Sequence, residues 1–180
     1  RVIDAICSSD ASDPPFEERH EDFSMALVVA GGFDYHGVHG RAHLQTGAVL
    51  LGNAGAAYSC GHTHSVGDRC IAFQFAPDVF EGLWAAHDCG TQRPTFSRSS
   101  LPSEKAGVRL ITAAEALAEG LSHVPAEDVA AMVAGFVLTR LGGAIAPVSD
   151  GHVRRVVEVA RAIEVEPDGD WSLARLARMA

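Results

Sequence analysis

The residues with the clearest chemical potential lie in one short stretch, CGHTHSVGDRC, which runs from Cys60 to Cys70. It holds two of the four cysteines and two of the nine histidines of the chain. On an extended strand, residues two apart point the same way, so Cys60, His62 and His64 are expected to share one face. If the chain then makes a hairpin turn, Cys70 supplies a fourth ligand from the returning strand. Two thiolates and two imidazoles are a tetrahedral set that structural zinc sites use.

Two other interpretations of this stretch stay open. His62-Thr63-His64 followed by Asp68 is similar to the His-x-His and later Glu of cupin metal centres, with a carboxylate one carbon shorter. Two histidines and a carboxylate with open positions would suit Fe(II) and oxygen chemistry, which implies a dioxygenase or isomerase. The second cupin motif, which brings another histidine, is not evident after Phe75, although His87 or an earlier histidine such as His36, His39 or His43 could substitute for it in space. Alternatively no metal binds, the histidines are solvated or hydrogen-bonded, and the two cysteines are small buried hydrophobes.

Composition limits the classes of function. The chain of 180 residues, 47% of them hydrophobic, can build a sizeable core in one domain or one and a half. With 14 basic and 23 acidic residues, the net charge of −9 argues against binding nucleic acid through a broad basic face. The four scattered cysteines favour a reducing cytoplasm. No apolar run reaches the roughly 18 residues of a membrane span. The chain begins at Arg1, so the natural N-terminus is expected to have been lost.

The elements that would position these residues change character along the chain. From residue 23 to residue 75, short apolar runs are broken by glycines, which is typical of a small antiparallel barrel or sandwich. Turns are expected at Gly31-Gly32 and from Gly37 to Gly40, and Pro77 is expected to end the last strand. The charged run from Glu17 to Asp22 is interpreted as a solvated approach to the first of these strands.

After about residue 100 the period becomes helical. PAEDVAAMVAGFVLTRLGG predicts a helix with one apolar face, formed by Val129, Met132, Val133, Phe136, Val137 and Leu141. ITAAEALAEGL is also expected to be helical, with Gly120 near its end. GHVRRVVEVARAIEVEP predicts a further helix that is closed by Pro167. In DGDWSLARLARMA, Ser172 is a good N-cap, Trp171 is expected to pack on Leu176, and a short helix should begin at Leu173 with that residue on its inner face.

The final helix, the Pro-Asp-Gly-Asp turn and the Trp-Ser-Leu-x-x-Leu-Ala opening of a second helix resemble the start of the DNA-binding domain of AraC-type transcription regulators. Upstream, ERHEDFSMALVVAGGFDYHGVHGRAHLQTGAVLLGNAG is similar to the cupin-like sensor barrel of that family. The resemblance implies an α+β protein, a cupin-like antiparallel β-barrel followed by α-helices. It implies a sensor barrel over residues 1–100, a helical dimerisation region over 101–149 and the truncated start of a helix-turn-helix domain over 150–180.

The resemblance also implies partners. The barrel would receive a small-molecule effector, helices after it would pair two subunits, and the full-length protein would bind DNA. Residues 152–180 contain five arginines and five acidic residues, so this part is neutral and the chain itself is expected to bind DNA negligibly. The interpretation is a non-enzymatic cytoplasmic regulator with zinc at Cys60, His62, His64 and Cys70. The alternative is a metal-dependent cupin enzyme that uses His62 and His64.

Three weaker features have simple structural explanations. The segment with His36, His39 and His43 is more typical of a polar surface hairpin than of a ligand set. The aromatic residues Phe73, Phe75, Phe80 and Trp84 could line a ligand cavity, although core packing is the default. The stripe from Val129 to Leu141 is a candidate pairing surface, and packing against its own barrel is the alternative. The sequence does not identify the effector, the operator, or activation as opposed to repression.

Overall fold

The computed structural model describes residues 1–62, 67–141 and 150–179. The chain divides into two compact units, Arg1–Gly143 and Ala144–Ala180. The first unit holds the described strands and the helices α1 to α3, and the second holds α4 and α5. The predicted α+β class, with strands first and most helices after them, is confirmed.

The strands are β1 (Val2–Cys7), β2 (Phe16–Arg19), β3 (Phe23–Gly37), β4 (Gly40–Gln45), β5 (Val49–Gly52), β6 (Ala57–Gly61), β7 (Asp68–Phe75) and β8 (Ser100–Leu101). All recorded pairings are antiparallel. One layer has the order β1-β7-β3-β5-β8, and the second half of β3 carries β4 on one side and β6, then β2, on the other. Between the described strands this pairing does not close into a complete barrel.

The long strand β3 belongs to both layers because it bends near Gly31. Its register against β7 shifts between Val28 and Ala30, and Gly31 has a φ of +67°, a conformation that glycine adopts without steric cost. The predicted turn at Gly31-Gly32 is therefore wrong: the chain continues through a bulge. The predicted turn from Gly37 to Gly40 is confirmed, because these two residues are paired at the end of the β3–β4 hairpin.

Alternation along the strands creates two cores. Here "outer core" means the cluster between the sheet and the helices, which contains Phe23, Met25, Leu27, Ile71 and Phe73 from the strands and Phe80, Leu110, Val129, Val133 and Val137 from the helices. "Inner core" means the cluster between the two layers, which contains Ala26, Val28, Phe33, Tyr35, Leu44, Ala48, Leu50 and Cys70, with Ala42, Tyr58, Cys60 and Ala72 packed against it. The candidate stretch thus contributes to the inner core.

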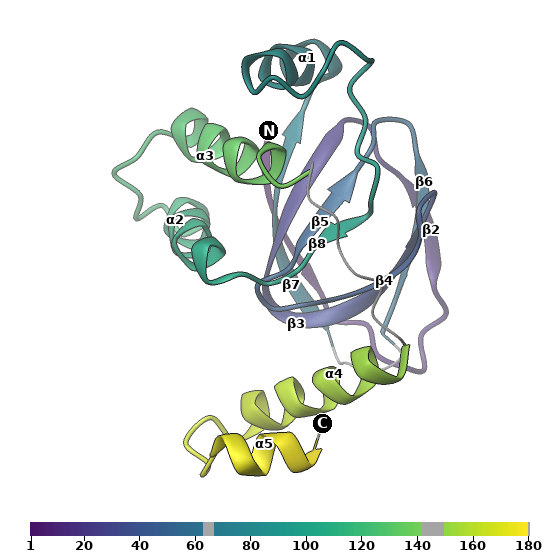
Figure 1. The fold of residues 1–180 in the computed structure, drawn as a ribbon, viewed down its shortest axis with the longest axis vertical. Helices are drawn as coiled ribbons and strands as arrows, with labels where there is room; N and C mark the ends of the chain where they lie inside the picture. Colours follow the sequence, from purple (N-terminus) through teal and green to yellow (C-terminus); the bar gives the residue numbers. More distant parts are fainter. Residues whose placement is uncertain (63–66, 142–149, 180) are drawn as a thin grey trace. The chain divides into compact units, whose positions relative to one another are not determined.

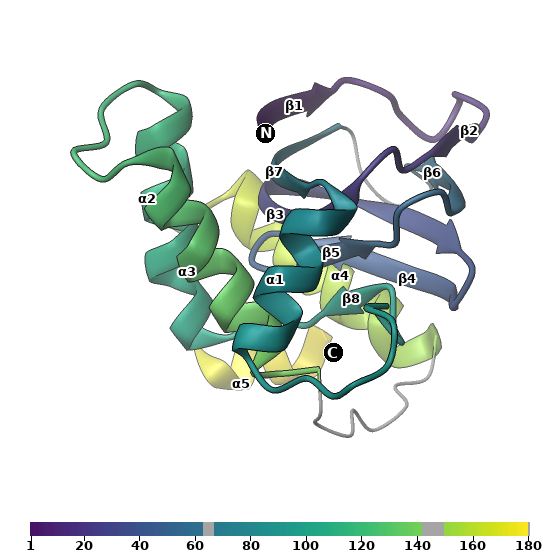
Figure 2. The same ribbon diagram turned by 90° about the horizontal axis from the view of Figure 1, so that it is seen from above.

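The helix α1 (Pro77–Ala86) follows β7 directly, and sequence reasoning missed it. Pro77 was interpreted only as the end of a strand, but proline is also favoured in the first turn of a helix, where its missing N–H costs nothing. Phe80 is the buried residue of this helix. Figure 2 shows α1, α2 and α3 on one side of the sheet, away from β2, β4 and β6.

The helices α2 (Val108–Ala118) and α3 (Ala126–Leu138) contact each other and cover the outer core (Figure 1). Both were predicted. Val129, Val133 and Val137 recur every four residues and are completely buried. For these three valines, burial supports the second interpretation of the apolar stripe, which is packing of the helix against the sheet of the same chain. Met132, which was predicted to share this apolar face, is instead 47% exposed.

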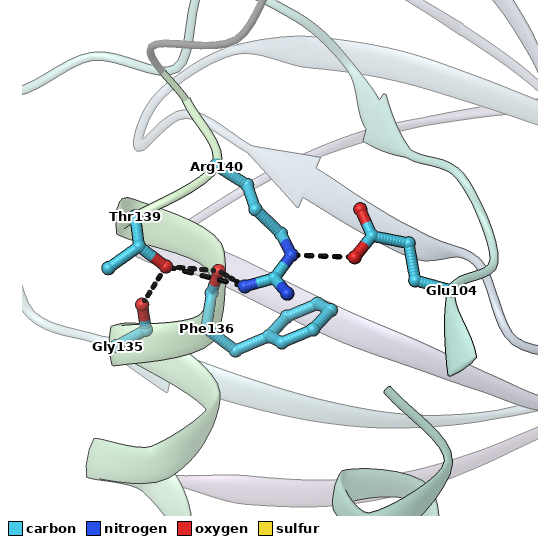
Figure 3. A network of polar contacts seen from close by, with 5 residues as sticks. All are labelled: Glu104, Gly135, Phe136, Thr139 and Arg140. Carbon is cyan, nitrogen blue, oxygen red and sulfur yellow. Dashed lines mark hydrogen bonds and ion pairs between the residues drawn. The ribbon is translucent and has the colours of Figure 1, made fainter. Parts of the chain in front are cut away.

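A polar network holds the end of α3 to the segment before α2 (Figure 3). Arg140 donates from Nε to Glu104 at 2.8 Å and from Nη1 to the carbonyl of Phe136 at 3.0 Å. Its guanidinium also lies 3.7 Å from the centroid of the Phe136 ring. Charge, hydrogen bonds and stacking on the aromatic face act together here, which is the use that a guanidinium serves better than an ammonium group.

The second unit contains α4 (Asp150–Val165) and α5 (Leu173–Met179), which contact each other. Both helices were predicted, and Ser172 accepts a hydrogen bond from the backbone N–H of Arg175 as an N-cap does. The Trp171 indole donates to the carbonyl of Glu166 at 2.7 Å, and the Arg175 guanidinium lies over its ring. Leu173 is 85% exposed, which corrects its placement on an inner face.

Of the described helices, none has the length and apolar character needed to cross a bilayer.

Candidate functional site

A cluster of aromatic and polar side chains occupies one part of the inner core. The Nε2 atom of His20 lies 3.0 Å from the hydroxyl of Tyr35, and the His20 ring stacks on Tyr58 with centroids 4.2 Å apart. The two tyrosine rings are themselves stacked at 5.3 Å. The Tyr58 hydroxyl donates to the carboxylate of Glu18. Polar atoms inside an otherwise apolar layer are therefore held at defined positions.

Local structure explains why these three rings meet. Tyr35 lies opposite Cys60 in the β3–β6 pairing, and Tyr58 is two residues before Cys60 on the same strand. The side chains of Tyr35, Tyr58 and Cys60 therefore point to the same face of this layer. His20 follows β2, and its backbone N–H and carbonyl bind Ala56 and Gly55. The ring of His20 fills the space beside Gly52 that a Cβ atom there would occupy.

Burial favours the uncharged forms of the three rings, His20, Tyr35 and Tyr58. Desolvation lowers the pKa of His20, although the nearby charge of Glu18 acts in the opposite direction. Burial raises the pKa of Tyr35 to about 12 and also raises the pKa of Tyr58, which is further raised by its contact with Glu18. At neutral pH the three rings offer uncharged hydrogen-bonding groups, with the Glu18 carboxylate beside Tyr58.

This electrostatic state predicts an acid-sensitive stability. Because the native pKa of His20 is lowered, the unfolded chain binds a proton first as the pH falls below about 6.5, so stability falls by up to roughly 1.4 kcal/mol per pH unit. A His20→Gln variant is expected to lose this part of the slope. Urea unfolding at a series of pH values measures it, with His123→Gln, an exposed site, as the matched control. Equal slopes in wild type and His20→Gln would contradict the prediction.

A second group of candidate side chains lies at the Cys60–Cys70 stretch. His62 is almost fully buried, and its Nε2 atom lies 2.8 Å from Oδ2 of Asp68. The Cys70 thiol donates to Oδ1 of the same carboxylate at 3.3 Å. Cys7, at the end of β1, lies opposite Asp68 in the β1–β7 pairing. Sequence reasoning did not include Cys7, because the pairing of β1 with β7 was not predicted.

The structure brings together only some of the predicted zinc ligands. Cys60 and Cys70 both contribute to the inner core, His62 lies beside Asp68, and His64 lies outside the described residues. The hairpin expected between the two cysteines is wrong, because β6 pairs with β2 and β3 while β7 pairs with β1 and β3. The zinc set of Cys60, His62, His64 and Cys70 therefore stays a prediction.

Both thiols of this stretch are in surroundings that disfavour ionisation. Burial raises the pKa of Cys60 to about 12, and the charge of Asp68 adds to the effect. Burial and the Asp68 contact also raise the pKa of Cys70. These cysteines resemble buried hydrophobes rather than reactive nucleophiles while no cation binds.

Two weaker candidates are now placed. His43 is not on a polar surface: its Nδ1 atom lies 2.8 Å from Asp34, and its side chain is only 6% exposed. Among the aromatic residues considered for a ligand cavity, Phe73, Phe75 and Phe80 belong to the outer core. They support the packing of α1 on the sheet, as the default interpretation expected, although Phe73 and Phe75 also border a surface pocket of about 490 Å³. Trp84 is partly buried against the outer core and borders a separate surface cleft.

No family model matches the sequence, and no curated protein matches it significantly. Solved structures do match. ToxT from Vibrio cholerae O395 bound to (E)-4-(8-methylnaphthalen-1-yl)but-3-enoic acid gives a TM-score of 0.53 at 8% identity, covering 98% of this chain and 69% of ToxT. Another ToxT structure from that strain gives 0.53 at 11% identity, covering 98% and 67%. The AraC-like transcriptional activator CuxR gives 0.49 at 14% identity, covering 91% and 61%.

The fold is thus similar to that of ToxT, an AraC-family regulator, over nearly the whole chain. The resemblance to this family that the sequence predicted is confirmed at the level of the fold. At these identities the likeness concerns the fold and leaves the chemistry of the site to be argued from the residues themselves.

Proposed function

We propose that this chain is the sensor portion of an AraC-type transcription regulator and that its inner core receives a small-molecule effector. The observation that carries the proposal is the fold likeness to ToxT over 98% of the chain, which includes the helices after the sheet. The tail sequence from Trp171 supports it independently. The division into sensor barrel, dimerisation helices and start of a DNA-binding domain belongs to the same proposal.

The cluster of His20, Tyr35 and Tyr58 is the proposed contact point for the effector. One of the matched ToxT structures holds a carboxylic acid with a naphthalene ring. In the present chain, the buried polar or charged residues that the structure describes are His20, Ser24, His62 and Ser99, none of them a lysine or arginine, and burial favours neutral His20. The effector of this chain is therefore proposed to be uncharged, with a flat apolar part that stacks on tyrosine and one group that hydrogen-bonds to His20 or Tyr35.

Ligand-observed and protein-observed NMR with a library of neutral aromatic compounds and their carboxylate analogues tests this proposal. Neutral compounds are expected to bind and to shift the resonances of His20 and Tyr58. Tyr58→Ala is expected to weaken binding by about threefold to tenfold, since an aromatic pair contributes about 0.5–1.5 kcal/mol beyond the area that it buries. The exposed Phe16→Ala variant is the matched control. Preference for the carboxylates, or shifts confined to the 770 Å³ surface cleft beside Trp84 and His87, would overturn it.

DNA binding is proposed for a longer parent protein and not for these residues alone. The support is the helix pair α4 and α5 and their resemblance to the start of a helix-turn-helix domain, together with the neutral charge of residues 152–180. A gel-shift assay with this chain is expected to detect no tight, sequence-specific complex. Such a complex would remove this part of the proposal.

Homodimerisation is proposed to use the solvent-facing side of α3. The buried valines of that helix are occupied by the outer core, and Met132 is the large apolar side chain that it leaves exposed. Sedimentation at micromolar concentration is expected to show a dimer that Met132→Glu dissociates, because a charge would then be buried in the interface. A wild-type monomer, or a dimer that is unaffected by the change, would contradict this assignment.

A non-enzymatic role is part of the proposal. The alternative, a cupin dioxygenase or isomerase, needs His62 and His64 to hold iron with open positions for substrate and oxygen. Metal analysis separates the two: stoichiometric iron that is retained in a Cys70→Ser variant and lost in His62→Ala would support the enzyme instead.

A further inference from the structure

Three donor side chains from separate parts of the chain meet at one edge of the inner core. The Sγ atom of Cys7, a ring nitrogen of His62 and a carboxylate oxygen of Asp68 all lie within 4.8 Å of one another. Cys7 ends β1, His62 follows β6 and Asp68 begins β7. The convergence is a product of the tertiary structure, since Cys7 and His62 are 55 positions apart in the sequence.

Strand register explains why the donors face each other. Cys7 lies directly opposite Asp68, so the two side chains leave the β1–β7 ladder on the same face. Cys70 is two residues further along β7 and shares that face. It donates to Asp68 at 3.3 Å. This face is the one that contributes to the inner core, and His62 approaches it from the other layer.

We propose that Cys7, His62 and Asp68 bind a divalent cation that prefers mixed sulfur, nitrogen and oxygen ligands, Zn²⁺ in the first place, with Cys70 as the fourth donor. Zinc bonds of 2.0–2.3 Å place neighbouring donors of a tetrahedral site about 3.5 Å apart. Donor atoms within 4.8 Å reach that arrangement through side-chain shifts of about 1 Å. Binding releases the proton of each ligating thiol to solvent, whereas the His62 imidazole stays neutral and keeps its single N–H on the ring nitrogen that does not bind the cation.

The burial of these groups is the second observation. The His62 side chain is 1% exposed and that of Asp68 is 10% exposed. The Nδ1 atom of His62 is buried and has no hydrogen-bond partner among the described residues. An unpaired ring nitrogen and a carboxylate held in an apolar layer are costly unless they are compensated. A dication there would neutralise the carboxylate and one thiolate and would favour coordination by the imidazole.

The proposed ligand set differs from the one expected from the CGHTHSVGDRC spacing. It keeps His62 and Cys70, adds Cys7 and Asp68, and leaves out Cys60 and His64. It consists only of described residues. A cation bound in this way would join β1, β7 and the end of β6 and would stabilise the N-terminal strand on the sheet. The inference does not depend on the identity of the effector or on DNA binding.

Titration of the chelator-treated protein with Zn²⁺, and with Co²⁺ as a spectroscopic probe, tests the site. One equivalent is expected to bind, with a sulfur-to-cobalt charge-transfer band and a rise in melting temperature relative to protein in chelator. Cys7→Ser and Asp68→Asn are each expected to weaken binding at least about tenfold, since loss even of a residue that only orients a ligand has an effect of this size. Cys70→Ser is expected to reduce the charge-transfer band.

Matched controls make each outcome decisive. Cys60→Ala, in the same core, and Cys89→Ser, outside the cluster, are expected to bind like the wild type. Circular dichroism of each metal-free variant checks folding, and the comparison of wild type with and without chelator does not depend on any variant. A wild-type protein that binds neither ion overturns the proposal. Loss of binding in Cys60→Ala with full binding in Cys7→Ser also overturns it and favours the set that includes His64.

Discussion

Replacing Phe80 by alanine is expected to lower the free energy of unfolding by about 3–5 kcal/mol, the range measured when large aromatic residues are truncated in well-packed cores. Phe80 is completely buried. Its ring stacks on Phe23 at 4.2 Å and lies 5.1 Å from Phe96. Since it is the buried residue of α1, its loss leaves a cavity and removes the main attachment of that helix to the sheet.

Equilibrium unfolding in urea measures this effect. Val79→Ala, the neighbouring residue on the exposed side of α1, is the matched control and should change stability by less than about 0.5 kcal/mol. If Phe80→Ala lowered the free energy of unfolding as little as Val79→Ala, the attachment of α1 would not depend on Phe80. That result would also reopen the interpretation of the aromatic cluster as a ligand cavity, because a cavity wall tolerates truncation better than a filled core.

The second large effect is expected at Gly31, where an alanine should cost about 2–5 kcal/mol. Two causes add. A left-handed backbone conformation costs roughly 1–2 kcal/mol for a residue with a side chain. The new Cβ atom would also overlap the carbonyl oxygen of Gly67 and approach the Cα atom of Asp68, so backbone must move, at a cost typical of overpacking of about 1–3 kcal/mol.

Gly55→Ala separates these two causes. Gly55 also has a positive φ, +78°, but a Cβ atom there meets nothing within 4 Å. It should therefore show only the backbone cost, and the difference between the two variants in urea unfolding reports the close approach of β3 and β7. Equal destabilisation would contradict that close approach. Because Gly31 lies against Gly67 and Asp68, Gly31→Ala is also expected to disturb the Cys7–His62–Asp68 cluster, whereas Gly55→Ala is not.

Much of this protein could be predicted from local patterns. The strands between residues 23 and 75 and the helices α2 to α5 follow from apolar period, glycine and capping residues, which act over a few neighbours. Val129, Val133 and Val137 mark a buried helix face because their spacing matches the helical repeat. Errors occurred where one residue type serves two structures. Pro77 ends a strand and begins a helix, and Gly31 permits a turn but is used in a bulge.

The candidate sites depended on information that local patterns lack. The sequence by itself determined that one short stretch holds the potential metal donors His62 and Asp68 and two cysteines, and that alternation places Cys60 on the same face as Tyr58. Only the tertiary structure decided that β6 and β7 lie in different pairings, that Cys7 is opposite Asp68, and that His20 meets Tyr35 and Tyr58. The physical reason is that strand pairing is a choice among distant partners. The pairing that forms is the one that buries both faces of β3 at once. A short window of sequence does not show which distant strands can provide that burial.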